Sequence, residues 1–252
     1  MTAITAPGGL ASRVDAPSPL DVVRLQLAKR LAVFGVPLII IGFVFLGTAI
    51  ISLAIMRVTG GGGTSAGAVD GARFNQGMVW ALSGFMVALG VQGVSTAFPF
   101  ALALGATRRT FTLGTLLSNV VIAAYVTVVF TALLGLELLT GHWFVDIYLV
   151  DVYLLGAGNV AILMPAVFLG TLAMLAVGSL FGSAWIRFGA KGAGGLGLLL
   201  GLTLALTLLV LAPAIPDIAR AFQTWWLVVI AVAMILGSAI GSVLFLRGAS
   251  VR

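Results

Sequence analysis

The stretch Leu31–Met56, LAVFGVPLIIIGFVFLGTAIISLAIM, contains no Asp, Glu, Lys or Arg. A helix needs about 20 predominantly apolar residues to cross the hydrocarbon core of a bilayer, and this stretch is long enough to do so. Further stretches share its length and its lack of charge, and they lie at 74–107, 110–136, 152–186, 192–216 and 221–246. The sequence therefore predicts an all-α, polytopic membrane protein with six transmembrane helices.

Glycine, proline and polar residues within these stretches set the predicted boundaries of the helices. The spans are expected at about 31–56, 77–99, 111–136, 160–182, 195–213 and 225–246. Together they make one transmembrane domain, 31–246. Three shorter segments flank it: a disordered tail at 1–17, an amphipathic interfacial helix at 18–30 and a cytoplasmic tail at 247–252.

The composition limits the chemistry that the chain can perform. Hydrophobic residues make up 61% of the 252 residues and charged residues only 8%, whereas soluble domains carry about 25% charged residues. The chain has no Cys and a single His, so it offers no disulfide and no Cys-ligated metal site. We interpret the formal net charge of +6 as a topology signal, not as a nucleic-acid-binding surface.

Basic residues are distributed unevenly between the predicted loops. If the N-terminus is cytoplasmic, ten of the 13 Lys and Arg residues lie inside, and only Arg57, Arg73 and Arg220 lie outside. Cytoplasmic loops of membrane proteins carry such an excess, so both termini are predicted to be cytoplasmic. Tryptophans prefer the membrane boundary, and most of them fall at the predicted outer one: Trp80, Trp143, Trp225 and Trp226.

Residues 18–30, SPLDVVRLQLAKR, carry the signals of a helix that precedes the first span. Ser18 is a good N-cap, Pro19 suits the first helical position, and Asp21 completes a capping-box pattern. Apolar residues then recur at helical spacing, at Leu20, Val23, Leu27 and Leu31. This pattern predicts a short amphipathic helix at the membrane interface.

The predicted spans contain packing motifs and lack the motifs of catalysis. No Asp, Glu, Lys, Arg or His lies at mid-depth in the predicted spans, so the chain shows no proton relay. Gly192–Gly197 matches a dinucleotide fingerprint, but no strand precedes it, and no ATPase motif or catalytic motif is present. Three small-xxx-small motifs are predicted to be packing sites, within the bundle or at a subunit contact: Gly178–Gly182, Gly197–Gly201 and Gly237–Gly241.

The predicted outer loop after the third span holds His142, Asp146 and Asp151. His142 and Asp146 have the i, i+4 spacing at which two side chains on a helix could share a metal ion, but so few ligands make a weak site. We favour an aromatic interfacial segment with solvated acids. Glu137 is expected at the wet boundary of the membrane, not in a gate.

The segment Phe98–Gly114, FPFALALGATRRTFTLG, turns between the second and third spans. A positive-inside hairpin accounts for Arg108 and Arg109. It does not account for the apolar run from Phe98 to Leu104, which predicts a short helix along the interface.

The pattern FPxALxLGxTRRxFxLGT, with the W-x-R-x-G loop at Trp185–Gly189, resembles a permease subunit of a bacterial type-2 ATP-binding-cassette (ABC) transporter. The resemblance implies export across the bacterial plasma membrane by a dimer of permeases, either homo- or heterodimer, driven by a separate ATPase subunit. ATP would bind that partner, and this chain would hold no cofactor. Family members often have re-entrant helices between spans five and six, for which 214–224 leaves little room.

The resemblance also implies where the ATPase subunit would contact this chain. The coupling residues would be Gly105, Thr107, Arg108 and Arg109, with Asp21, Arg24, Lys29 and Arg30 at the flank. The alternative is a non-transporting membrane protein, such as an immunity or assembly subunit, that binds another membrane protein through its small-residue faces. A channel would need polar rings, and the scattered Ser and Thr residues form none. The composition leaves the substrate open.

Overall fold

The computed structural model describes residues 17–58, 66–221, 223 and 225–248, so nearly all of the predicted tails at 1–17 and 247–252 lies outside the described residues. Within these ranges no strand occurs, and six helices are long and apolar enough to cross a membrane. They lie at Leu31–Val58, Asp70–Ala103, Arg108–Leu139, Val160–Phe188, Ala190–Ile218 and Trp225–Arg247. The structure thus confirms an all-α, multi-pass membrane protein.

The α-helices follow one another along the chain as α1 Pro19–Leu27, α2 Val36–Val58, α3 Ala66–Arg73, α4 Gly77–Ser95, α5 Ala97–Ala103, α6 Arg108–Leu139, α7 Val160–Phe188, α8 Ala190–Leu211, α9 Ile215–Ala221 and α10 Trp225–Arg247. Short turns of other helix types connect some of them: η1 Leu31–Gly35, η3 His142–Asp146, η4 Tyr153–Leu155 and η5 Ala212–Ala214.

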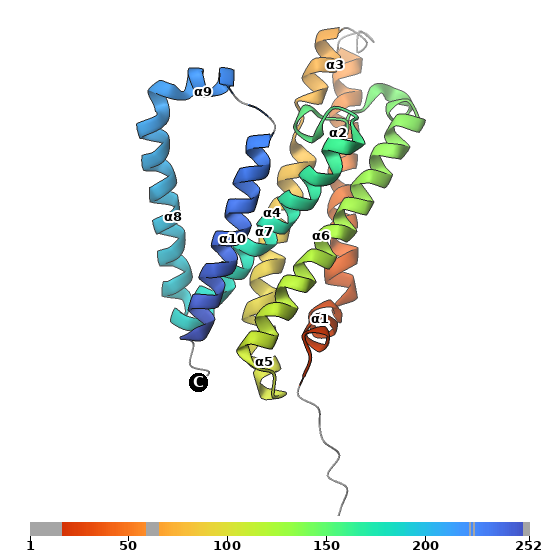
Figure 1. Ribbon diagram of the computed structural model, residues 1–252. Coiled ribbons are helices and arrows are strands. Elements are labelled where there is room, and N and C mark those ends of the chain that lie inside the picture. Colours follow the sequence, from red (N-terminus) through yellow and green to blue (C-terminus); the bar gives the residue numbers. More distant parts are fainter. Residues whose placement is uncertain (1–16, 59–65, 222, 224, 249–252) are drawn as a thin grey trace, which may run out of the picture.

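Helix α7 lies at the centre of the bundle and packs against α4, α6, α8 and α10 (Figure 1). Helix α2 packs against α4, and α8, which has no buried residue, leans away at one edge of the bundle. We call the end with α1, α5 and the last turn of α10 the α1 end, and the opposite end, with α3 and α9, the α3 end. As predicted, the described residues between α8 and α10 form little more than two short helical segments, η5 and α9.

Glycines allow α4 and α7 to cross at close range. A Cβ atom on Gly178 would lie 2.2 Å from the carbonyl oxygen of Val87 and 2.9 Å from the Cα of Gly90. A Cβ on Gly182 would likewise lie 2.7 Å from the carbonyl oxygen of Val91. The predicted packing site at Gly178–Gly182 is therefore a contact within the bundle. The space around Gly197 and Gly201 on α8 is largely open instead.

Helix α1 begins as the sequence predicts. The backbone N–H and the hydroxyl of Ser18 donate to Asp21 Oδ2 over 2.9 and 2.8 Å. The hydrogen bond from the Ser18 side chain is the main cause that lowers the pKa of the Asp21 carboxyl, and the bond from the Ser18 backbone adds to it. After Leu27 the chain continues through the π-helical turn η1 into α2.

The apolar face predicted for α1 is only partly right. Val23 is buried, but Leu20 is 58% exposed and Leu31 is 74% exposed. Val22, outside the predicted face, is buried instead, because it fits against Gly114 on α6, where a Cβ atom would lie 2.5 Å from the Val22 Cβ. The position of a glycine on another helix, which periodicity cannot report, decides which side of α1 packs.

Candidate functional site

Helix α5, a tight turn and the start of α6 form a hairpin at the α1 end. Gly105 has φ +87°, a left-handed conformation that glycine adopts at little cost. Thr107 caps α6 by accepting a hydrogen bond from the Thr110 N–H over 3.1 Å. A short helix is present where it was predicted, as α5 Ala97–Ala103, and it follows α4 directly within the candidate span Asp70–Ala103. Thr107 therefore fixes the start of α6, and Arg108 and Arg109 are the first two residues of this helix.

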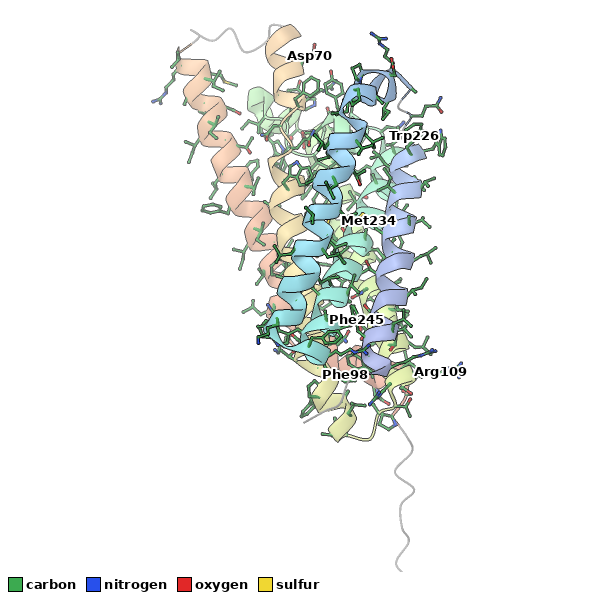
Figure 2. The ribbon with its side chains drawn as sticks, turned by 90° about the vertical axis from the view of Figure 1, so that its left-hand side faces the viewer. Asp70, Phe98, Arg109, Trp226, Met234 and Phe245 are labelled. Atoms are coloured by element: carbon green, nitrogen blue, oxygen red, sulfur yellow. The ribbon has the colours of Figure 1, made fainter. Side chains whose placement is uncertain are left out.

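The hairpin shares a small apolar core, here called the hairpin core, with α1 and the end of α10. Its buried members are Val22, Val94, Phe98, Ala101, Ala106, Phe111 and Leu246. The rings of Phe98 and Phe111 meet edge to face with centroids 5.1 Å apart. Phe98 and Phe245, which lies on the last turn of α10, are at the same end of the bundle in Figure 2. Segments far apart in the sequence thus form one unit.

A hydrogen-bonded glutamine joins α1 to the bundle beside this core. Gln26 Nε2 donates to the carbonyl oxygen of Gly93 over 3.0 Å and to Thr115 Oγ1 over 2.9 Å. Because both acceptors lie on other helices, Gln26 fixes α1 against α4 and α6. We did not predict this role, although a lone glutamine between Leu25 and Leu27 is the signal that could have shown it.

Arg108 and Arg187 fasten the end of α10. Arg108 Nη1 donates to the carbonyl oxygens of Leu246, over 3.2 Å, and of Arg247. Arg187 Nη1 donates to the carbonyl oxygen of Leu244 over 3.2 Å. The last carbonyls of a helix have no partner within it and carry partial negative charge, so both arginines stabilise this terminus. Arg108 therefore links the hairpin to α10.

The remaining basic residues predicted at the site stay near the surface. The Arg24 side chain is 82% exposed and lies 3.7 Å from Asp21. Arg30 and Arg109 are exposed, and within the described ranges the Arg109 guanidinium has no hydrogen-bond or ion-pair partner. Lys29 is exposed at the rim of a cavity. The α1 end thus presents positive charge, and in the described part of the chain its one acidic residue is Asp21.

The α3 end contains a buried carboxylate, that of Glu137, where the sequence predicts a solvated residue. Glu137 is 0% exposed and accepts hydrogen bonds from the backbone N–H groups of Leu149, Val150 and Asp151 over 2.9, 2.8 and 3.3 Å. The prediction of a wet boundary residue is wrong, because the segment after α6 folds back over the end of that helix. The Glu137 carboxylate is the structural anchor of this segment.

Asp151 is also buried, at 1% exposure, so the prediction of a solvated acid is wrong for it. Its Oδ2 atom lies 2.9 Å from Arg73 Nη2 and 3.0 Å from His142 Nε2. The His142 ring stacks on Tyr148 with centroids 4.3 Å apart. Within the described residues, no group of three or more His, Asp or Glu side chains could hold a metal ion. These contacts tie the 140–159 segment to α3.

No family model, no curated protein and no solved structure matches the chain. The fold and the site define the class of protein, which is a multi-pass membrane protein. One end of it presents a basic surface, and the hairpin core lies at that same end.

Proposed function

We propose that this chain is the permease subunit of a type-2 ABC exporter in the bacterial plasma membrane, with the α1 end in the cytoplasm and a separate ATPase subunit bound there. One observation carries the proposal. Helix α1 and the α5–α6 hairpin, the two segments that the family resemblance assigns to the ATPase contact, share the hairpin core. Exposed Arg24, Arg30 and Arg109 would face the ATPase, which would offer acidic groups to them.

The proposal gives the two arginines of the hairpin different roles. Arg109 is exposed and would contact the ATPase directly. Arg108 is a positioning residue, because its guanidinium is bonded to the carbonyl oxygens at the end of α10. A displacement of the hairpin would then move α10 through Arg108 and α1 through the hairpin core.

An external energy source fits the membrane part of the chain. The predicted spans hold no Asp, Glu, Lys, Arg or His at mid-depth that could couple an ion gradient to transport. Closure of the ATPase on ATP drives transport only if it favours one arrangement of the helices over another. The unit that carries the hairpin core would be the part that changes position.

A second permease subunit would cover α8. This helix has no buried residue, and the open sides of Gly197 and Gly201 match the small-xxx-small pattern of close helix contacts. The translocation pathway would lie between the two subunits. The alternative, a non-transporting subunit that binds another membrane protein, would use the same face of α8 and would not need the basic surface at the α1 end.

Charge reversal tests the proposal. The tagged chain is solubilised in mild detergent from its native cells, and its copurifying proteins and their ATPase activity are measured. The variants Arg109→Glu and Arg30→Glu should lose a stoichiometric ATPase. The control Arg220→Glu, at an exposed arginine of α9 on the α3 end, should keep it. A reproducible membrane partner without any ATPase would replace the proposal by the alternative.

A further inference from the structure

A cavity of about 260 Å³ lies at the α1 end, between α1 and the helices α4 to α7. Its deeper wall is apolar and includes Val33, Leu89, Ile122 and Leu175. Its polar groups are Gln26, Lys29, Gln92, Thr96 and Asn119. Arg24, Arg30 and Arg109, the arginines that we assign to the ATPase contact, do not line it, and Lys29 is the one predicted coupling residue that does.

One polar side chain of the lining has no hydrogen-bond partner in the described part of the chain. The Gln26 amide is bonded to Gly93 and Thr115, but the Gln92 side-chain amide has no hydrogen-bond partner among the described residues. Gln92 is exposed near the end of α4, and the Thr96 hydroxyl, one turn further, donates back to the Gln92 carbonyl oxygen over 2.7 Å. An amide without a partner is costly in an apolar medium, so a polar group from outside the protein should reach Gln92.

The charge at the rim of the cavity determines whether the polar group that reaches Gln92 should be anionic or cationic. Among the residues that the structure describes, Lys29 is the one charged residue that lines the cavity, and no acidic side chain lines it. The ammonium group is exposed, so it can move toward a bound anion. Rim residues Gln92, Thr96 and Phe100 are exposed, and they belong to the helix Asp70–Ala103, which is long and apolar enough to cross a membrane. Charge and position together select an anionic molecule that enters from the bilayer.

We propose that the cavity binds one anionic phospholipid from the surrounding leaflet. The headgroup phosphate lies beside Lys29 and accepts hydrogen bonds from the Gln92 amide, while an acyl chain lies against Val33, Leu89 and Ile122. Small-molecule sites usually measure about 300–1,000 Å³, so this cavity of about 260 Å³ holds only part of the lipid, and the rest extends along α4. The bound lipid joins α1 to α4. The site does not depend on the proposed function.

Native mass spectrometry of the full chain in detergent, titrated with phosphatidylglycerol or with phosphatidylcholine of the same acyl chains, tests the site. One phosphatidylglycerol should bind about five-fold more tightly than phosphatidylcholine, which corresponds to the roughly 1 kcal/mol that one basic residue contributes at an anionic membrane surface. Lys29→Gln should abolish this preference by weakening phosphatidylglycerol binding more than phosphatidylcholine binding. Arg30→Gln, its exposed neighbour outside the cavity, is the matched control and should keep the preference.

A second pair of variants tests the location. Gly93 lines the cavity and a Cβ there meets nothing within 4 Å, so Gly93→Leu should fill the space and reduce binding of both lipids at least ten-fold. Gly84 on the same helix also has open space around its Cβ but does not line the cavity, so Gly84→Leu should bind like the unaltered protein. Equal affinity for the two lipids, or Lys29→Gln without effect, would overturn the headgroup assignment. Unchanged binding in Gly93→Leu, or no bound lipid at all, would overturn the site.

Discussion

Replacing Gly178 with alanine should force α4 and α7 apart at the centre of the bundle. The added Cβ would lie 2.2 Å from the carbonyl oxygen of Val87 and 2.9 Å from the Cα of Gly90, whereas ordinary contacts lie at 3.4–4 Å. Both are backbone atoms, so no side-chain rotation relieves the overlap. The helices must separate by about 1 Å, and overpacking of this kind costs about 1–3 kcal/mol.

A control on the same helix isolates this cost. Alanine is favoured over glycine in a helix interior by about 1 kcal/mol, and this gain partly masks the overlap in Gly178→Ala. At Gly170 a Cβ meets nothing within 4 Å, so Gly170→Ala shows the gain alone. The free energy of unfolding of Gly178→Ala should therefore be about 1–3 kcal/mol below that of Gly170→Ala.

The assay is reversible unfolding in mixed micelles by sodium dodecyl sulfate, followed by far-ultraviolet circular dichroism. Both variants and the unaltered protein are measured at one detergent concentration, because stability in micelles depends on it. Gly178→Ala that is as stable as Gly170→Ala would refute the close crossing of α4 and α7, and with it the packing of the helix at the centre of the bundle.

Three further changes probe the two ends of the bundle. Glu137→Gln should lower the free energy of unfolding by about 1.5–3 kcal/mol, because the new NH₂ group faces a backbone donor where the carboxylate accepted a hydrogen bond. An unchanged free energy of unfolding in the same micelle titration would contradict the role of Glu137 as a buried anchor. Arg108→Gln should speed amide hydrogen exchange in the last turn of α10, and Arg109→Gln should not; equal rates in the two variants would argue against the link between the hairpin and α10. The pKa of the Asp21 carboxyl should lie below its ordinary value of 3.8, so the cap of α1 is intact at neutral pH and is lost as the pH falls through the lowered pKa. A titration of the ¹³C carboxyl chemical shift with a midpoint at or above 3.8 would disprove the hydrogen bonds from Ser18.

The features that could be predicted have signals that are local in the sequence. Uncharged stretches locate the six long helices because a bilayer demands about 20 apolar residues in a row. Asp21 follows Ser18 by three positions, and Gly105 precedes Thr107 by two, so the start of α1 and the turn of the hairpin depend on neighbouring residues alone.

The features that could not be predicted depend on contacts between distant segments. Arg108 meets the carbonyl oxygen of a residue 138 positions later. Glu137 is buried because the backbone 12 to 14 residues further along turns back toward it. Sequence alone shows an acid at the end of a span, and an acid there is usually wet. The burial of Val22 in place of Leu20 has the same origin, since it follows from the glycine at position 114 on α6.

The proposed contact between the α1 end and an ATPase is tested most directly by site-specific photo-crosslinking in native membranes. A photoreactive amino acid replaces Arg109 in one strain and Arg220 in another, two exposed positions at opposite ends of the bundle. The proposal predicts that position 109, and not position 220, crosslinks to a nucleotide-binding ATPase, and that the crosslink weakens when Arg30→Glu is added. A crosslink from position 109 to lipid or to another membrane protein, with no ATPase captured from either position, would contradict it.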